Sequence, residues 1–302
     1  MVDESLKSRY DFAMKFLVGI ILIYVVLQWI ELKCFRVTDY TVFHKKLQEN
    51  HEICFLSDLH GFTYSGRLIE RIRKLNPDVI VIGGDVVSKK EPEQMTSMLN
   101  FLEELTFIAK VYYCFGNHET TIHELLSKES NLYEEKWVSY MDKVQAMGIT
   151  IVRNHEIKLF DDINLTALEL PCQYFEKKDI PKLTMDVMNK LLGKEKLDNT
   201  NFEILVAHHP LFARDYLELE PDLILSGHTH GGLIRFPVIG SIISTEFQWN
   251  PEFDGGKYEL ENKDGKKCNL IVSKGLGTHT FHIRVFDRAE IIMIHLKQEK
   301  EK

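Results

Sequence analysis

Cysteine is scarce in this 302-residue chain, and its pattern excludes two common uses of the residue. The five cysteines are odd in number and form no Cys-x-x-Cys pair, so the sequence indicates neither a disulfide framework nor a thiolate zinc site. Cys54 and Cys114 lie in apolar runs and are predicted to be buried thiols. Cys34 follows an apolar segment, and we interpret it as an idle thiol, with lipid attachment as the alternative.

The chain also lacks an excess of positive charge. It has 37 basic and 45 acidic residues, which give a net charge of -8 and a pI near 5.9. Proteins bind nucleic acids largely by neutralising phosphates with Lys and Arg, so we expect no nucleic-acid partner. A small phosphate ligand drawn in by metal ions is compatible with this charge.

One long apolar run lies near the N-terminus. Residues 16–30 are interrupted only by Gln28, and extension to about residues 12–32 gives the ~20 residues that a bilayer span needs. We predict that residues 1–32 form a tail and a membrane anchor, in a single-pass membrane protein whose orientation the Lys and Arg counts leave open. A cleaved signal peptide is disfavoured because no cleavage motif follows, and a core helix because no polar face appears.

Residues 33–302 are predicted to form one domain. In them, short apolar runs alternate with segments whose apolar residues recur at helical spacing. The patterns predict strands at 51–56, 79–82, 111–115, 149–152 and 163–168, and helices at 66–75, at 93–107 and in a region that ends at Gly148. A βαβαβ order of this kind predicts a sheet with parallel strands and with helices on its faces.

The second half has little helix between its later strands. Short strands are predicted at 204–207, 223–225, 270–273 and 291–296, and they suggest a second sheet packed on the first. A polar insertion at about 172–200 is predicted to form a helix with Val187, Leu191 and Leu192 as its apolar contacts.

Polar residues follow three successive predicted strands. Asp58 and His60 follow the first strand, Asp85 the second, and Asn117 and His118 the third. Ligands gather at the carboxyl edge of an open α/β sheet, so we expect these side chains to converge. If strand geometry continues past the first strand, Asp58 and His60 point to the same side and can share an ion. Taken alone, each motif has a simpler reading, such as Asp85 capping a helix.

Histidines follow two strands of the second half. His208 and His209 precede a proline, and His228 and His230 are spaced two residues apart. The candidate metal ligands are Asp58, His60, Asp85, Asn117, His208, His228 and His230. One metal needs about four protein ligands, so this set indicates two ions that share a carboxylate. Imidazoles with carboxylates suit divalent manganese, iron or zinc. A role in packing alone would leave several polar side chains costly to bury.

In chain order, these motifs resemble the signature of the calcineurin-like metallophosphoesterases. The matching motifs are Asp58-x-His60, Gly84-Asp85, Gly116-Asn117-His118-Glu119, His208-His209-Pro210 and Gly227-His228-Thr229-His230. A tail of Gly275-Leu276-Gly277, Arg284-Val285-Phe286 and Glu290-Ile291 is similar to the membrane-anchored bacterial branch of that family. Ala289 stands where that branch usually has proline, which we interpret as a local loop change.

The resemblance implies an α/β fold of two packed mixed β-sheets flanked by helices, with a transmembrane helix before it. It implies one ion held by Asp58, His60, Asp85 and His230, and a second held by Asp85, Asn117, His208 and His228. Asp85 would bridge the two ions. His118 would stand outside the metal shell as the catalytic residue, and His209 would be a wall residue of the site.

The activity that the resemblance implies is hydrolysis of a phosphate ester. Two ions ~3.5–4 Å apart can clamp a phosphoryl group and generate a bridging hydroxide at neutral pH. His118 is the candidate general acid for the leaving alkoxide, or a charge stabiliser. The anchor favours a phosphodiester or pyrophosphate of a membrane-associated or lipid-headgroup substrate. The alternatives are a phosphomonoesterase or phosphoprotein phosphatase, and a non-catalytic metal-binding module.

The other histidines are predicted to have no chemical role. The surface or packing residues in this group are His44, His51, His123, His155 and His295. His279 and His282 follow a glycine-rich turn and are candidates for the rim of the site.

Overall fold

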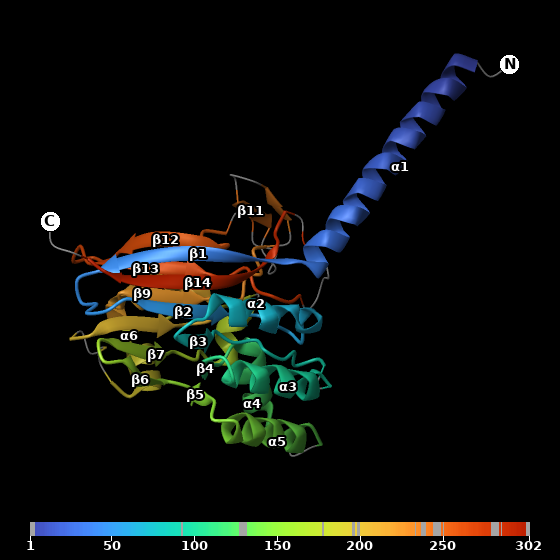
Figure 1. The fold of residues 1–302 in the computed structure, drawn as a ribbon. Helices are drawn as coiled ribbons and strands as arrows, with labels where there is room; N and C mark the ends of the chain where they lie inside the picture. The colour runs from blue at the N-terminus through green and yellow to red at the C-terminus, as the bar shows by residue number, and fades with distance from the viewer. Residues whose placement is uncertain are drawn as a thin grey trace.

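Two six-stranded sheets lie face to face in the computed structural model, and helices cover their outer faces (Figure 1). The structure describes residues 4–91, 93–126, 132–176, 178–194, 197, 200–232, 234–236, 240–243, 249, 251–278, 284 and 286–299. An inner cluster of buried apolar side chains joins the sheets, with Ile53 and Val81 on one side and Ile204 and Ile271 on the other. The predicted packing of a second sheet on the first is confirmed.

The first sheet is mixed. Its strands in order are β1 (Phe35–His44), β14 (Ala289–Gln298), β2 (His51–Leu56), β3 (Val79–Ile82), β4 (Lys110–Cys114) and β5 (Thr150–Val152). Strands β2 to β5 are parallel to one another, whereas β14 is antiparallel to β2 and parallel to β1. The predicted strands at 51–56 and 79–82 coincide with β2 and β3.

Side chains along the central strands alternate between two apolar layers. In β2, Ile53 and Phe55 enter the layer between the sheets, while Cys54 and Leu56 pack under the helices on the outer face. Because both faces are covered, β2 and β3 read as continuous apolar runs rather than as an alternating pattern. The buried Cys54 and Cys114 agree with their predicted burial.

The second sheet is also mixed. Its strands in order are β12 (Gly256–Glu261), β13 (Lys267–Val272), β9 (Leu223–Ser226), β8 (Phe202–Val206), β7 (Ile163–Ala167) and β6 (His155–Phe160). The four central strands are parallel, and the edge strands β12 and β6 are antiparallel to their neighbours. A separate antiparallel pair consists of β10 (Ile234–Phe236) and β11 (Gly240–Ile243).

Helices cover both outer faces. On the first sheet these are α2 (Arg67–Leu75), α3 (Gln94–Thr106), α4 (Asn117–Leu126) and α5 (Leu132–Ala146), and on the second α6 (Met185–Leu192) and α7 (Ala213–Tyr216). Helix α2 buries Leu68, Ile69 and Ile72 on one face, as its periodicity predicts, and ends where Asn76 turns left-handed at a φ of 48°. In the predicted insertion, Leu192 of α6 is buried. Val187 and Leu191 pack against the cluster of buried apolar side chains between α6, α7 and the second sheet.

The prediction that the strand at 291–296 belongs to the second sheet is wrong. This strand is part of β14, which runs through the first sheet between β1 and β2. Ten residue pairs join β14 to β1, and five join it to β2. An apolar run shows that a strand is buried but not which strands it pairs with. In addition, β1, which forms more residue pairs with β14 than β2 does, was not predicted.

Helix α1 (Glu4–Lys33) extends away from both sheets (Figure 1). By length and composition, its stretch Arg9–Lys33 is able to cross a membrane, and its apolar window is 0% buried. Large side chains such as Phe16 and Trp29 are each 64% exposed. The predicted apolar segment therefore forms one continuous helix whose surface water would solvate poorly.

Polar contacts fix the base of α1 to the segment before β14 and to α2. Gln28 donates a hydrogen bond to the carbonyl of Arg284 and accepts one from the Arg284 N–H at 3.1 Å. Arg67 donates to the carbonyl of Lys33 at 2.6 Å. The one polar residue that interrupts the apolar run thus holds the helix against the segment before β14.

Candidate metal centre

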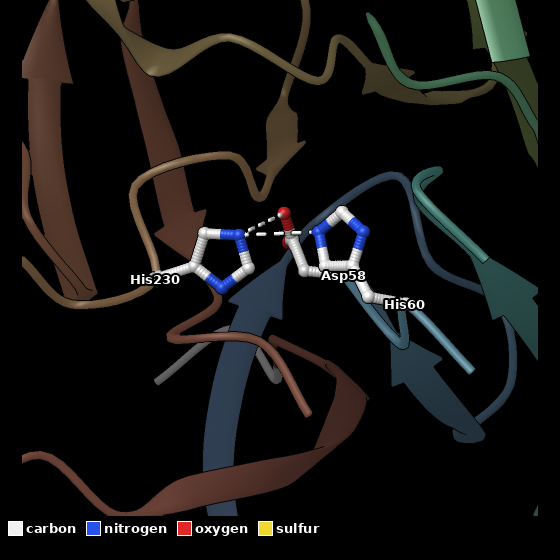
Figure 2. A group of neighbouring side chains, drawn as sticks. All are labelled: Asp58, His60 and His230. Carbon is white, nitrogen blue, oxygen red and sulfur yellow. Dashed lines mark hydrogen bonds and ion pairs between the residues drawn. The ribbon is translucent and has the colours of Figure 1, made fainter. Parts of the chain in front are cut away.

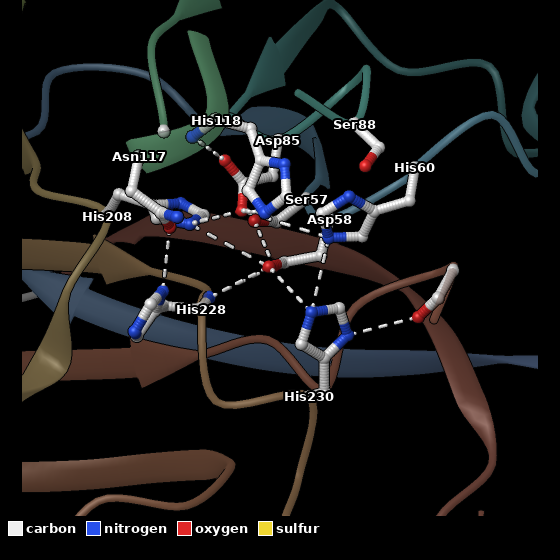
Figure 3. Close-up of polar contacts among 12 residues, drawn as sticks. Ser57, Asp58, His60, Asp85, Ser88, Asn117, His118, His208, His228 and His230 are labelled. Carbon is white, nitrogen blue, oxygen red and sulfur yellow. Dashed lines mark hydrogen bonds and ion pairs between the residues drawn. The ribbon is translucent and has the colours of Figure 1, made fainter. Parts of the chain in front are cut away.

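Polar side chains gather where parallel strands of both sheets end. Asp58, Asp85 and Asn117 follow β2, β3 and β4 by two or three residues, and His208 and His228 follow β8 and β9 by two. Figure 3 shows these side chains turned toward one another from separate elements. The predicted convergence at the carboxyl edge is therefore present in the structure, and both sheets contribute to it.

The candidate ligands lie on left-handed turns. The φ angles of Asp58, His60, Asp85, His228 and His230 are 53°, 44°, 55°, 69° and 50°. This conformation costs a non-glycine residue roughly 1–2 kcal/mol. The condition that strand geometry continue past the first strand is not met, because β2 ends at Leu56. Two left-handed residues instead bring Asp58 and His60 together. Strain of this kind clusters at functional sites.

The turns hold one another in place through their backbones. The N–H of Asp58 donates to the carbonyl of Gly84 at 2.9 Å, and that of His60 donates to the carbonyl of Asp85 at 3.0 Å. The N–H of His228 donates to Asp58 Oδ1 at 3.0 Å. Each strained turn is thus stabilised by hydrogen bonds from a turn on another strand.

Glycine is required where these turns approach each other. A Cβ on Gly227 would lie 2.3 Å from Asp58 Oδ2, and one on Gly116 would lie 2.3 Å from Asp85 Oδ1. These distances are far inside van der Waals contact, so any side chain would displace the carboxylate. The glycines of the Gly-Asn-His-Glu and Gly-His-Thr-His motifs therefore make room for the two carboxylates.

Asp58, His60 and His230 form one group of facing ligand atoms (Figure 2), which lie within 4.8 Å of one another. Nε2 of His230 is 3.4 Å from Asp58 Oδ1 and 3.2 Å from Nε2 of His60. Two atoms bonded at ~2.1 Å to the same ion lie about 3.0–3.4 Å apart. The group has the spacing of ligands around one ion.

Asp85, His208 and His228 form a second such group. Nε2 of His208 is 3.2 Å from Asp85 Oδ2, and Nδ1 of His228 is 2.9 Å from the side-chain oxygen of Asn117. Asp85 Oδ2 also lies 3.8 Å from Nε2 of His60 in the first group. Asp85 therefore lies between the two groups.

Backbone carbonyls orient two of the imidazoles. Nδ1 of His208 is 2.7 Å from the carbonyl oxygen of Gly83, and Nδ1 of His230 is 3.0 Å from that of Gly277. A carbonyl only accepts, so Nδ1 carries the proton in each ring and the Nε2 lone pair of the neutral ring faces the carboxylates.

The donor set fits a pair of divalent ions. A neutral His208 would direct an Nε2 lone pair at Asp85 Oδ2, and this buried Nε2 makes no hydrogen bond within the described part of the chain. Two acceptors that face each other in a buried site repel unless a proton or a metal ion lies between them. Neutral imidazoles with carboxylates are ligands that manganese, iron and zinc accept.

The electrostatics of the centre favour positive charge. Burial raises the pKa of Asp85, but positive charge on His118 and His208 outweighs it and holds that pKa well below its usual range. Burial lowers the pKa of His208, but the charges of Asp85 and Asp58 outweigh it and raise the pKa to about 10. A divalent ion would take the place of this proton, because a metal ligand must be deprotonated.

His118 lies beside Asp85 in the first turn of α4. Its Nδ1 accepts a hydrogen bond from the N–H of Lys89 at 2.9 Å, so the proton of the neutral ring is on Nε2. Nε2 is 4.0 Å from Asp85 Oδ2, and His60, Asp85 and His118 form a third group of close ligand atoms. A protonated Nε2 cannot ligate a metal, so this geometry suits a hydrogen-bond donor better than a ligand.

Glu119 holds the Asp85 turn, a role that the sequence did not reveal. Its fully buried carboxylate accepts hydrogen bonds from the N–H groups of Asp85 and Val86 at 2.8 Å and of Gly116 at 3.0 Å. Burial, followed by repulsion from Asp85, raises the pKa of Glu119 to about 7. The sequence did contain a signal for this role: Glu119 is an acidic residue three positions after Gly116, in the first turn of α4.

Arg284 holds the turn that orients His230. Its buried guanidinium donates to the carbonyls of Lys274, Gly275 and Gly277 at 3.0, 3.2 and 2.8 Å. The Gly277 carbonyl also accepts from His230 Nδ1. Sequence reasoning gave Arg284 only as part of a family resemblance, and nothing in the sequence indicated which carbonyls it contacts.

The remaining described histidines have structural surroundings. His209 stacks on Phe175 with ring centroids 5.2 Å apart and lies beside His228, in agreement with a wall position. The contacts of the others are to protein groups away from the centre: His44 to Asp222, His51 to Asp162, His123 and His155 to Arg153, and His295 to Asp39. His279 and His282 lie outside the described residues.

We expect Arg284→Lys to weaken metal binding by roughly 10- to 100-fold, because lysine keeps the charge beside Asp287 but cannot reach three carbonyls at once. Titration of the metal-free full chain with Mn²⁺ or Zn²⁺ measures this. The control is Arg288→Lys, at an arginine whose side chain is 41% exposed and whose ion pair is with Glu31. Equal metal affinity in the two variants would contradict a positioning role for Arg284.

The chain is similar to proteins of one phosphoesterase family. The calcineurin-like phosphoesterase family matches residues 51–232. An uncharacterized metallophosphoesterase of Campylobacter jejuni is 27% identical over 84% of this chain, and the chain spans only 61% of that relative's length. Phosphodiesterase YaeI of Escherichia coli is 26% identical, over 89% of this chain and 88% of its own.

A third relative is the UDP-2,3-diacylglucosamine pyrophosphatase LpxG of Chlamydia muridarum, which is 23% identical over 84% of this chain and 87% of its own. Among solved structures, the NAD nucleotidase of Haemophilus influenzae aligns over 75% of this chain and 45% of its own, with a TM-score of 0.41 and 15% identity. The family match covers more than half of the chain and contains Asp58, His60, Asp85, Asn117, His208, His228 and His230, and the chain therefore belongs to the calcineurin-like phosphoesterases.

Proposed function

We propose that this metallophosphoesterase hydrolyses a phosphodiester or pyrophosphate of a membrane-associated or lipid-linked substrate with two bound divalent ions. The observation that carries the proposal is the position of Asp85 between two groups of facing ligand atoms. One group of this kind would support a single-metal site. Two groups joined by a buried carboxylate support a binuclear one.

We assign the ligand residues to the two ions according to these two groups of side chains. Asp58, His60, Asp85 and His230 hold the first ion, and Asp85, Asn117, His208 and His228 hold the second. Manganese, iron or zinc is the metal that this mixture of nitrogen and oxygen ligands suits. When bound, the ions would supply an activated water and neutralise charge on the phosphoryl group.

The chain itself then supplies orientation and a hydrogen-bond donor. The carbonyls of Gly83 and Gly277 keep the lone pairs of His208 and His230 aimed into the centre. The N–H of Lys89 keeps the proton of neutral His118 on Nε2, which faces the centre. From Nε2–H, His118 can donate a hydrogen bond to the leaving oxygen and stabilise the negative charge that develops there as the phosphorus–oxygen bond breaks, and solvent then protonates the alkoxide.

The proposed substrate class rests on α1 and on two relatives. A helix that is able to cross a membrane ends at Lys33, and β1 of the domain begins at Phe35, so the domain lies at the base of the helix. One relative is named as a phosphodiesterase and another as a pyrophosphatase of a diacylated sugar nucleotide. We accordingly propose a single-pass anchor in residues 1–32 and a catalytic domain in residues 33–302, with an insertion at about 172–200.

A comparison of substrates tests this class. With the full chain in neutral detergent, we expect faster turnover of a lipid-linked pyrophosphate than of a soluble nucleotide diester, and the slowest turnover for p-nitrophenyl phosphate. Phosphate release measures all three. A monoester preference would replace the proposal with a phosphomonoesterase or phosphoprotein phosphatase, and no turnover by the metal-loaded chain would indicate a non-catalytic module.

Asp85→Asn should remove both metal binding and activity, because the amide has nearly the same shape but no charge and cannot bridge two cations. Metal content after dialysis and turnover of bis(p-nitrophenyl) phosphate measure the two effects. Asp161→Asn, at a fully exposed carboxylate, is the matched control. Retention of two ions and of activity in Asp85→Asn would refute the bridging assignment.

His118→Ala should keep the metal and lower the rate by ~100-fold or more on a substrate with an alkoxide leaving group, because the hydrogen bond to the leaving oxygen is lost. The loss should be much smaller with p-nitrophenolate, whose negative charge is delocalised over the ring. His123→Ala, on the same helix and partly exposed, is the control. Equal losses on both leaving groups would show that His118 does not act on the leaving oxygen.

A further inference from the structure

A pocket of about 380 Å³ lies beside the base of α1, and its volume falls in the ordinary range for small-ligand sites. Its lining residues are Glu31, Arg36, Arg235, Lys274, Phe286 and Arg288. They come from the end of α1, the start of β1, strand β10, the turn after β13 and the segment before β14. None of them belongs to the proposed metal centre.

The lining of this pocket is basic although the chain is acidic. Four of the six lining residues are cationic and one is acidic, whereas the whole chain has a net charge of -8. Glu290 and Asp254, which lie behind the lining, pair with Arg36 and Arg235 at 3.3 and 2.8 Å. Positive charge and N–H donors still exceed the anions available to them.

Lys274 lacks a close anionic partner. Its Nζ is 3.9 Å from Glu290 Oε2, which is too far for a hydrogen bond, although the side chain is only 9% exposed. Glu290 Oε2 instead accepts from Thr38 at 2.6 Å and from Arg36 at 3.3 Å. Burial lowers the pKa of Lys274, and an anion in the pocket would stabilise its charged form.

Arg288 also has unused donors. Its nearest acidic partner is Glu31, at 3.9 Å, again too far for a hydrogen bond. Nε of Arg288 and Oε2 of Glu31 are buried and have no hydrogen-bond partner among the described residues. A ligand with several acceptor oxygens would satisfy the donors of Lys274 and Arg288 together.

The place of the pocket restricts the source of such a ligand. Arg36 lies only three residues after α1 ends at Lys33, so the pocket is within ~10 Å of the end of a helix able to cross a membrane. Phe286, at the rim, is 52% exposed and presents an apolar ring next to the cations. Cations directly beyond a membrane helix meet the headgroup layer, where anionic lipids offer phosphate oxygens.

We propose that this pocket binds the phosphate headgroup of an anionic phospholipid, with Lys274 and Arg288 as the principal donors and Phe286 against the acyl side. The proposal rests on the membrane position of α1 but not on turnover or on bound metal. The pocket is also close to the metal centre: Gly275 follows Lys274, and a Cβ on it would lie 2.7 Å from the Cβ of Asp58. A lipid held here would fix this face of the domain on the membrane surface.

Isothermal titration of the full chain in neutral detergent tests the proposal. The probes are dihexanoyl phosphatidylglycerol, dihexanoyl phosphatidylcholine and inorganic phosphate. We expect phosphatidylglycerol to bind at least about tenfold more tightly than either other probe. The double variant Lys274→Met with Arg288→Gln should weaken that binding by at least about tenfold, since charge-assisted hydrogen bonds are lost.

The matched control removes two other cations near the same helix end. Arg71 and Lys74 are exposed on α2, in a separate surface groove that also contains Phe35. Arg71→Gln with Lys74→Gln should leave the affinity within about twofold. If both double variants weaken binding equally, the attraction is a general charge effect and the proposed pocket is wrong.

Three other results would overturn the proposal. Equal affinity for phosphatidylcholine would remove the preference for an anionic lipid. Equal affinity for inorganic phosphate would make the ligand a soluble phosphate. Loss of binding after EDTA would place the ligand at the metal centre, whereas unchanged binding after EDTA supports the pocket. Arg288→Gln alone serves if the double variant does not fold, because that side chain is 41% exposed.

Discussion

The geometry of the candidate metal centre depends on the burial of two carboxylates. Asp58 and Asp85 are at most 1% exposed, and a buried carboxylate is costly unless hydrogen bonds or positive charge surround it. Each carboxylate accepts a backbone N–H from a turn on another strand: Asp58 from His228 and Asp85 from His118. The imidazole of His208 lies within 3.7 Å of both carboxylates. The two sheet edges therefore have to meet in one register, because any slip would leave these charges without partners.

Strain in the ligand-bearing turns is the consequence of that convergence. A side chain that leaves a strand in extended geometry points above or below the sheet, whereas the left-handed φ of Asp58 and Asp85 directs each side chain into the centre. A second layer stabilises these turns: Glu119 accepts from the Asp85 turn, and Arg284 holds the carbonyl that orients His230. Motif residues that ligate nothing are thus as necessary to the geometry as the ligands.

Local pattern predicted the strands but not their partners. The apolar runs at 51–56 and 79–82 match β2 and β3, because burial on both faces leaves a signal in composition alone. The place of β14 was mispredicted and β1 was not predicted, because pairing between strands some 250 residues apart has no local signature. The candidate ligands were found from their residue types at strand ends. Their left-handed turns, and the contacts of Glu119 and Arg284, depend on distant backbone positions that spacing does not encode.

The metal centre and the base of α1 share one turn of chain. The carbonyls of Lys274, Gly275 and Gly277 accept from Arg284, whose own backbone pairs with Gln28 of α1. The same turn donates from Gly277 N–H to the Asp58 carbonyl at 2.6 Å and accepts from His230. The segment that contacts α1 therefore also supports a candidate ligand group. These contacts place the candidate centre on the side of the domain that meets α1, which is the arrangement that the proposed membrane-associated substrate requires.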